Sequence, residues 1–279
     1  MIQIENLAFS YGITPVLKNI TTTLTEGRIF GLLGENGVGK TTLLTLLVGL
    51  KEPKIGRITT DGHIPFKRDP DFLSDQYYIP DTVAPLNMSA TDFAKSTGIF
   101  WPNFDLSKFS QILGEFEVKA SQNMSTMSAG QLKKTYIAFA FASGAKNLFM
   151  DEPTNGLDIP SKAQFRSAIM KYTREDGIIV ISTHQVRDLE NIIDPIIILD
   201  RQDVLLNASV EEITSKLYFD YGRELHDDSL YSEQLPGGYI QVRPNQTGEE
   251  SKISVEALFN AAHLHKETIK SMFSDNENI

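Results

Sequence analysis

The 279-residue sequence contains no cysteine, which excludes disulfide scaffolds and metal sites built from thiolates. Long apolar runs are also missing: the longest, residues 43–50, is far shorter than the roughly 20 residues that a membrane-spanning helix needs. Residues 1–5 show neither the basic nor the apolar segment of a signal peptide. We therefore expect a cytoplasmic protein, unless something else holds it as a peripheral protein at the cytoplasmic face of a membrane.

Positive charge is scarce, and the formal net charge is -10. Residues 201–279 hold 7 basic and 14 acidic side chains, so about -7 of the excess lies in the last part of the chain. A net negative protein is a poor ligand for a phosphate backbone, so we expect no nucleic-acid partner. The change in composition predicts a boundary near residues 200–218, and the length suits one large α/β domain with a small appendage.

One glycine-rich segment matches the pattern G-x-x-x-x-G-K-[ST] and lies between a strand-like run, residues 28–33, and a helix-like run, residues 40–50. Such a loop turns backbone N–H groups and the start of a helix toward phosphate oxygens, while Lys40 adds a charge and Thr41 offers a hydroxyl to Mg²⁺. The predicted nucleotide contacts are Gly34, Glu35, Asn36, Gly37, Val38, Gly39, Lys40, Thr41 and Thr42. The motif alone does not choose among kinases, GTPases, motor proteins and transport ATPases.

Strand and helix patterns alternate along most of the chain, which predicts a largely parallel sheet with sites at the carboxyl ends of its strands. Asp61-Gly62 is a hairpin signal. Ser89 and Asp92 read as the start of a helical insert over residues 87–145. The expected strands are 2–9, 16–24, 28–33, 76–79, 147–150, 178–182 and 196–199, and helices are expected near 161–174 and 185–192.

The pattern weakens after Tyr218. Only one strand, residues 239–242, and one helix, residues 254–273, are predicted there. We expect residues 1–217 to form the main domain and residues 218–279 a small accessory domain without catalytic residues.

Two strand ends carry candidate catalytic side chains. Asp151 and Glu152 follow an apolar strand, where the first carboxylate is suited to hold magnesium and the second to polarise a water that attacks the γ-phosphate. His184 follows another buried strand and is suited to donate a hydrogen bond to the γ-phosphate. Taken singly, the carboxylates also fit a polar turn before Pro153, and a lone histidine at a strand end is more often structural.

A further segment, Met127 to Gln131, opens a helix-like run 23 residues before Asp151. Together with the phosphate loop, the Asp-Glu strand end and His184, it resembles the ATPase subunit of an ABC transporter over residues 1 to about 217. The resemblance implies an α/β P-loop NTPase fold of the ABC ATPase type: a mostly parallel sheet core, an antiparallel β subdomain, a helical insert and a small C-terminal extension.

The resemblance also implies roles for single residues. Tyr11 matches the aromatic that stacks on adenine, residues 155–158 match the loop that crosses the dimer interface, and His184 matches the switch histidine. The signature residues, which in this family bind the ATP of the opposite protomer, are Ser128, Ala129, Gly130 and Gln131.

The sequence departs from the family pattern in three respects. Met127 and Ala129 replace the leucine and first glycine of the usual Leu-Ser-Gly-Gly, and Lys134 stands where arginine is common. The third departure is Asp81, a carboxylate at the place of a metal-sensing glutamine. We expect Asp81, with Thr41 and Asp151, to belong to the metal site.

The resemblance implies ATP and Mg²⁺ as cofactors, ATP hydrolysis coupled to transport, and a membrane-spanning permease as partner. It further implies a homodimer, or a heterodimer with a related ATPase, formed on ATP binding, and the acid at position 81 favours an exporter. An alternative is a soluble ATP-gated clamp of the same fold acting on ribosomes or nucleic acid, although such chains carry fused cassettes, coiled coils or basic arms. A GTPase or kinase is disfavoured because no Asn/Thr-Lys-x-Asp motif occurs.

Overall fold

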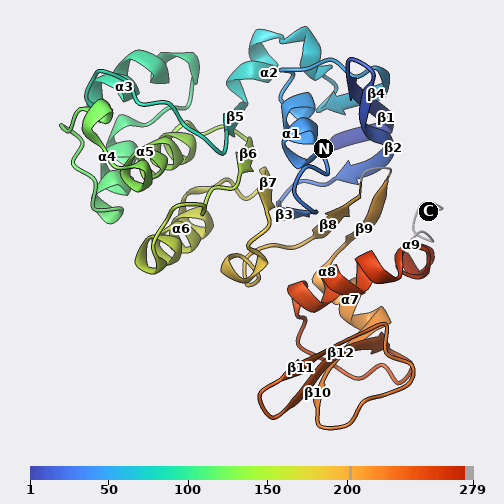
Figure 1. Ribbon diagram of the computed structural model, residues 1–279. Helices are drawn as coiled ribbons and strands as arrows, with labels where there is room; N and C mark the ends of the chain where they lie inside the picture. The colour runs from blue at the N-terminus through green and yellow to red at the C-terminus, as the bar shows by residue number, and fades with distance from the viewer. Residues whose placement is uncertain (201–202, 274–279) are drawn as a thin grey trace.

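A six-stranded sheet forms the centre of the computed structural model, which describes residues 1–200 and 203–273 (Figure 1). Its strand order is β5-β6-β7-β3-β8-β9, with β9 antiparallel to β8 and the other pairs parallel. The strands are β3 (Arg28–Leu33), β5 (Gln76–Ile79), β6 (Asn147–Asp151), β7 (Ile178–Thr183), β8 (Ile196–Leu199) and β9 (Val204–Ala208). This confirms the α/β fold predicted from the sequence.

Both faces of the central sheet are buried, which explains why its strands are almost continuously apolar. In β7, Ile179 and Ile181 join the core beneath the helical region, while Ile178 and Val180 join the core beneath the N-terminal sheet. The parallel register places Asp151 beside Ser182 and Leu33 beside Thr183. The carboxyl ends of β3, β6 and β7 therefore meet at one edge.

An antiparallel sheet of order β2-β1-β4 covers one face, as expected. It consists of β1 (Ile2–Tyr11), β2 (Thr14–Leu24) and β4 (Ile55–Thr60), and it packs with α1 (Lys40–Leu47) against the central sheet. The Asp61-Gly62 turn is present, but it is closed by a single bridge between Thr60 and His63 and joins no second strand.

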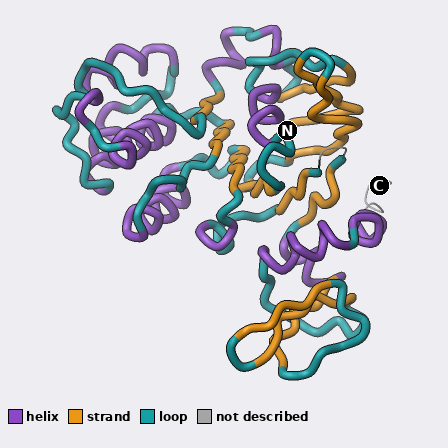
Figure 2. Tube along the Cα trace, in the orientation of Figure 1, coloured by secondary structure: helices purple, strands orange, loops and turns teal. Residues whose placement is uncertain are grey.

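The helical region lies to one side of the strands (Figure 2). Ser89 caps its first helix by accepting from the Asp92 N–H at 3.1 Å, as predicted. Its α-helices are α3 (Ala90–Thr97), α4 (Leu106–Glu115) and α5 (Ala129–Ala142). The 3₁₀ turn η2 (Gly98–Phe100) follows α3, and η3 (Met124–Thr126) precedes α5. Before this region come the turn η1 (Pro65–Lys67) and the helix α2 (Pro70–Ser74), and after it α6 (Ile159–Tyr172) follows β6. The helix α2 was not predicted.

The helix predicted over residues 185–192 is wrong. The segment forms only the 3₁₀ turn η4 (Val186–Asp188). Most of its backbone bonds are local turn bonds: the N–H groups of Asp188, Leu189 and Ile192 donate to carbonyls three residues earlier, and the Thr183 hydroxyl accepts from the Gln185 N–H at 2.9 Å. One tertiary contact is added, because Arg166 Nη1 donates to the Asp188 carbonyl at 3.2 Å. Turn bonds and side-chain contacts thus stand where a helix would make a continuous series of i→i−4 bonds.

The C-terminal part holds more structure than the sequence indicated. It consists of α7 (Val210–Lys216), β10 (Leu217–Gly222), β11 (Tyr231–Leu235), β12 (Gly238–Pro244), α8 (Val255–Leu264) and α9 (Lys266–Phe273), with the strands in a sheet of order β10-β12-β11. The single helix predicted over 254–273 is wrong, because His265 has a non-helical backbone and separates α8 from α9. The break allows α9 to pack on β9, with Ile269 buried.

Buried apolar side chains continue from the central sheet into this C-terminal unit, residues 217–273. Ile196 and Leu205 belong to the same core cluster as Val242 and Leu258. A domain boundary at residues 217–218 stays a prediction. Among the described residues, the structure has no helix with the length and apolar character to span a bilayer.

Candidate functional site

The phosphate loop leaves the carboxyl end of β3 and enters α1 at Gly39. This glycine has a φ of 118°, and a Cβ there would lie 2.7 Å from Leu17 Cδ2, so backbone conformation and space both require glycine. Lys40 is buried and donates to the carbonyls of Gly34 at 2.7 Å and Glu35 at 3.2 Å. Burial lowers the pKa of Lys40, and the negative charges of Glu152 and Asp151 oppose that shift.

Asp151, at the end of β6, connects the phosphate loop to β7. Its Oδ2 accepts from the Thr41 hydroxyl at 2.6 Å, and its Oδ1 accepts from the Ser182 hydroxyl. Only 2% of Asp151 is exposed. The Thr41 hydroxyl and this carboxylate are hard oxygen donors next to each other, which is the donor chemistry that Mg²⁺ prefers in a phosphate site.

Glu152 is held in an uncommon backbone conformation with a φ of 47°. A residue with a Cβ pays roughly 1–3 kcal/mol for such a conformation, and it persists where its surroundings impose it. Here the Glu152 N–H donates to the Ser182 carbonyl at 3.0 Å. The turn directs the carboxylate toward His184, whose Nδ1 lies 2.7 Å from Glu152 Oε1.

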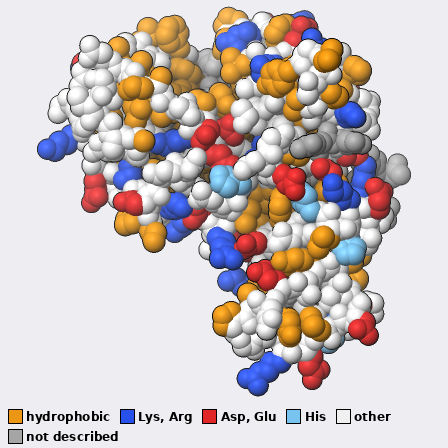
Figure 3. Space-filling model, in the orientation of Figure 1, with side chains coloured by type: hydrophobic (Ala, Val, Ile, Leu, Met, Phe, Trp, Pro, Cys, Tyr) orange, Lys and Arg blue, Asp and Glu red, His pale blue; other side chains and the backbone are white. Residues whose placement is uncertain are grey.

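The predicted nucleotide and catalytic residues gather around one cavity of about 430 Å³. In Figure 3, acidic and histidine side chains lie side by side near the middle of the visible face, between the helical region and the sheets. The cavity is lined by Tyr11, Val16, Asn36, Gly37, Gly39, Lys40, Thr41, Thr42, Asp81, Asp151, Glu152, Asn155 and His184. Residues from five separate segments of the chain therefore meet at the edge that the strand pattern predicted.

No cluster of three or more His, Cys, Asp or Glu side chains suited to a metal occurs in residues 1–200 and 203–273. A magnesium ion at Thr41 and Asp151 would take its remaining ligands from nucleotide phosphates and water, as is usual for Mg²⁺. The residues present therefore fit this ion.

Asp81 lines the same cavity, but its carboxylate contacts a side chain of the chain itself. Asp81 Oδ1 accepts from Asn155 Nδ2 at 3.2 Å. Asn155 belongs to the segment that matches the family's interface loop. A role of Asp81 at the metal stays a prediction.

Lys133 in α5 is a further residue at the cavity that no sequence motif marks. This side chain is 4% exposed, and its Nζ donates to the carbonyls of Asp81 at 2.5 Å, Pro80 at 3.3 Å and Glu152 at 3.4 Å. Burial lowers the pKa of Lys133, while the carboxylates of Asp81, Asp151 and Glu152 oppose that shift. Lys133 thus ties α5 to two segments of the cavity. No local signal separates it from an ordinary solvent-facing lysine.

The signature residues lie at the start of α5 and do not line the cavity. Ser128 accepts from the Gln131 N–H at 3.2 Å, and Gln131 Oε1 accepts from the Ser128 N–H at 3.0 Å. This reciprocal capping box satisfies the helix end. Ser128 and Ala129 are exposed to solvent, and Gly130 is partly exposed.

Tyr11 lies at the rim of the cavity, half exposed, with its hydroxyl 3.4 Å from Thr42 Oγ1. Lys51 Nζ lies 4.8 Å from the centre of its ring. The ring is thus placed at the mouth of the phosphate loop.

The family model described as ABC transporter matches residues 17–155. The chain belongs to this family. An uncharacterized ABC transporter ATP-binding protein of Methanocaldococcus jannaschii is 27% identical over 242 residues, which cover 84% of this chain and 88% of the relative. The linearmycin resistance ATP-binding protein LnrL of Bacillus subtilis is 28% identical, covering 78% and 72%. The arabinose import ATP-binding protein AraG of Mannheimia succiniciproducens is 26% identical, covering 98% and 54%.

Two solved structures share the fold. An ATP-binding subunit of an ABC transporter has a TM-score of 0.71 and 23% identity, over 76% of this chain and 91% of the other. A dimeric ATP-binding cassette in a post-hydrolysis state, bound to ADP and Pi, has a TM-score of 0.66 and 22% identity, over 75% and 99%. The chain is therefore the ATP-binding subunit of an ABC transporter, and it hydrolyses ATP to drive transport. Subunits of this family dimerise and pair with membrane permeases.

Proposed function

We propose that the cavity at the edge of the central sheet binds ATP with Mg²⁺ and hydrolyses it through Glu152 and His184. The contact of 2.7 Å between His184 Nδ1 and Glu152 Oε1 is the observation that carries this proposal. It places a carboxylate, fixed by its backbone conformation, beside a histidine in a cavity that also holds the phosphate loop. Such a carboxylate is suited to accept a proton from the attacking water.

The phosphate loop supplies binding. Backbone N–H groups at the start of α1 and the Lys40 ammonium neutralise phosphate charge, and little reorganisation is needed because Lys40 already lies within the loop. Thr41 and Asp151 would hold a magnesium ion, whose charge would offset that of the phosphates. Tyr11 is assigned to the adenine, since its ring lies at the cavity rim.

Hydrolysis takes place in a head-to-tail dimer in which the signature residues meet the ATP of the other protomer. Ser128 and Ala129 are exposed and lie outside the cavity of their own chain, which supports this arrangement. The second protomer is either another copy or a related ATPase.

Asp81 is assigned a place within one water of the magnesium ion. It lines the same cavity as Thr41 and Asp151, and its carboxylate is a hard oxygen donor. Its contact with Asn155 would couple that place to the dimer interface.

We assign the chain to the cytoplasmic face of the membrane, where it drives a separate permease, and we propose export as the direction. The carboxylate at position 81 supports export by resemblance. The names of the relatives include both resistance and import, so transport of a labelled substrate into inverted vesicles decides the direction.

Glu152→Gln tests the catalytic assignment. The amide keeps the shape of the side chain and leaves Lys40, Thr41 and Asp151 in place, so ATP affinity should change by less than about twofold while kcat falls by about 100-fold or more. Steady-state phosphate release and equilibrium nucleotide binding are measured on the same preparation. A variant that retains near-parental kcat would show that Glu152 is not the base.

A further inference from the structure

The segment that follows His184 is clamped from two sides. On one side, α6 holds it: Lys162 Nζ lies 2.6 Å from Asp188 Oδ2 and donates to Gln185 Oε1 at 3.1 Å. These contacts come from within the main body, because α6 follows directly after the interface loop.

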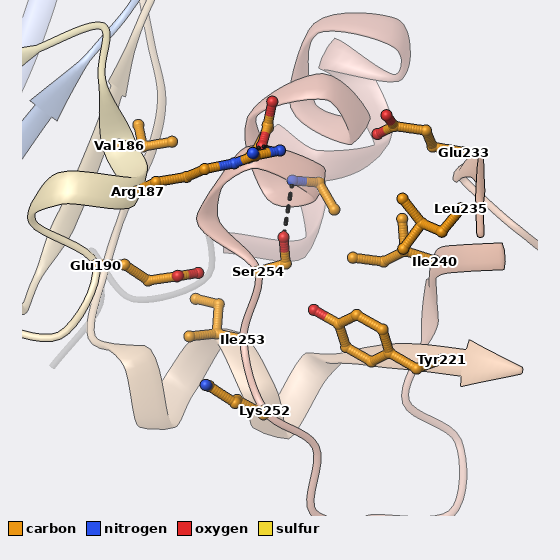
Figure 4. Close-up of a pocket in the computed structure, with 12 residues that line it drawn as sticks. Val186, Arg187, Glu190, Tyr221, Glu233, Leu235, Ile240, Lys252, Ile253 and Ser254 are labelled. Atoms are coloured by element: carbon orange, nitrogen blue, oxygen red, sulfur yellow. Dashed lines mark hydrogen bonds and ion pairs between the residues drawn. The ribbon is translucent and has the colours of Figure 1, made fainter. Parts of the chain in front are cut away.

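The second clamp comes from the C-terminal unit. The Arg187 guanidinium pairs with Glu256, with Nε donating to Oε2 at 2.6 Å and Nη2 lying 2.5 Å from the same oxygen. Glu190 Oε1 accepts from the Val255 N–H at 2.9 Å. Figure 4 shows Arg187 and Glu190 both projecting from the turn toward the start of α8.

These two contacts are reciprocal in charge and meet at the first turn of α8. The segment gives a cation to Glu256 and a carboxylate to the N-terminus of the helix, where the helix dipole and a free N–H favour an anion. Such a pair of contacts fixes both the distance and the rotation of the turn relative to α8.

The same helix also borders the catalytic residues. Glu256, Phe259 and Asn260 of α8 line a cavity of about 330 Å³. Its other walls are the start of the phosphate loop and the end of β7 with the residues that follow it, namely Leu33, Gly34, Glu35, Asn36, Thr183, His184 and Val186. The C-terminal unit is therefore packed directly against the switch histidine's surroundings.

We propose that Arg187 and Glu190 are positioning residues that let the C-terminal unit hold His184 against Glu152. This rests on the proposed role of His184. The chain from His184 to Glu190 contains no α-helix. Its path is therefore set by β7 at one end and by the contacts of Arg187 and Glu190 with α8 at the other. His184 is 42% exposed at its side chain, and its position relative to Glu152 depends on that path. The C-terminal unit thereby sets the rate of turnover without touching the nucleotide.

Charge reversal in the full-length protein tests the ion pair between Arg187 and Glu256. Arg187→Glu and Glu256→Arg should each lower kcat about fivefold with the KM for Mg-ATP within about twofold, because binding groups stay in place while the His184 contact loosens. The double reversal should return kcat to within about twofold of the parent. Arg187 is 81% exposed, so the variants should keep the parental circular dichroism and melting temperature.

Glu190 provides an independent arm. Glu190→Gln keeps an oxygen that accepts from the Val255 N–H and should stay near the parental kcat, whereas Glu190→Ala should fall as Arg187→Glu does. Lys266→Glu is the matched control, since Lys266 also ties the C-terminal unit to the main body, through Asp200, without contacting the switch segment. Its kcat should equal that of the parent.

A second measurement separates positioning from general loosening. In a His184→Ala background, Arg187→Glu should cause no further loss of kcat, because the residue through which it acts is gone. Equal losses in both backgrounds, single reversals with parental kcat, or a double reversal that stays slow would each overturn the inference. If His184→Ala itself keeps parental turnover, the proposed function of His184 fails and the inference fails with it; if only His184→Ala is slow, the inference alone fails.

Discussion

The phosphate-loop cavity and the signature turn, residues 127–131, are built in opposite ways. In the cavity, side chains distant in sequence bond to one another: Thr41 to Asp151 at 2.6 Å and His184 to Glu152 at 2.7 Å. At the signature turn, Ser128 and Gln131 bond to each other within one helix start, with Ser128 exposed and Gln131 partly exposed. The cavity is organised by bonds between distant segments, whereas the signature turn is a self-contained helix end, which we propose meets the second protomer.

One buried side chain connects the two regions. Lys133 lies in the helix that the signature turn begins, yet its ammonium bonds to the carbonyls of Asp81 and Glu152 in the cavity. These bonds join α5 to the turn that carries the proposed base. The two regions differ in construction, and Lys133 is a direct structural link between them.

The largest effect is expected from removing the Lys40 charge, which should lower the affinity of the cavity for ATP. Lys40→Ala should weaken ATP affinity by about 10- to 100-fold, because a buried hydrogen bond to a charged group contributes about 1.5–3 kcal/mol. Equilibrium binding of a fluorescent ATP analogue measures this. Lys18→Ala, at an exposed lysine of β2, is the control and should bind like the parent. Parental affinity in Lys40→Ala would remove this residue from the phosphate site.

A change at the signature turn should leave binding intact and affect only assembly. Ser128→Asp keeps a good N-cap for α5 but adds a negative charge, which would face the γ-phosphate of the ATP that the second protomer binds. In the Glu152→Gln background it should weaken the ATP-driven dimer by about tenfold. Light scattering with Mg-ATP measures the mass, and Ser128→Asn, which caps without a charge, should dimerise better. Equal dimerisation of both variants would contradict the head-to-tail arrangement.

Removing the Lys133 ammonium, which joins α5 to the cavity, should lower both turnover and stability. Lys133→Met fills a similar volume but leaves three carbonyls without their donor, so we expect a loss of about 1–3 kcal/mol in the free energy of unfolding. We also expect kcat to fall about fivefold as the turn at Glu152 loosens. Urea unfolding and phosphate release measure the two effects. Lys119→Met, at an exposed lysine of the helical region, is the control, and equal behaviour of the two variants would contradict the bridging role.

The smallest effect is expected at Asp81. Asp81→Ala should raise the Mg²⁺ concentration for half-maximal hydrolysis about threefold, because a hard oxygen near the ion is lost. Asp81→Asn keeps an acceptor for Asn155 without the charge, so it separates the hydrogen bond from the metal contact. A magnesium titration that gives one value for all three proteins would remove Asp81 from the metal site.

The sequence predicts five of the six strands of the central sheet, most of them as apolar runs that are buried on both faces, but the edge strand β9 was not predicted. The bounds of β3, β5 and β8 agree with the predictions to the residue. The turn η4 could not be predicted in this way, since its contacts come from α6 and α8. The strand β11 was not predicted for a different reason: most of its side chains are exposed, so the sequence shows no alternation of apolar and polar residues there.

The candidate site shows the same division. Gly39, Lys40 and Asp151 are found from contiguous motifs, in which the chemistry requires a fixed local order. Lys133 and Arg187 are not found, because their importance depends on partners 19 to 69 residues away. The local sequence therefore records contiguous motifs and not contacts between distant segments.

The most direct test is a double-mutant cycle of Glu152→Gln and His184→Ala, with kcat measured by phosphate release at saturating Mg-ATP. If the two side chains act as one unit, the double variant should be no more than about twofold slower than Glu152→Gln alone. If the two losses multiply, the 2.7 Å contact does not join them in catalysis and the central claim is contradicted.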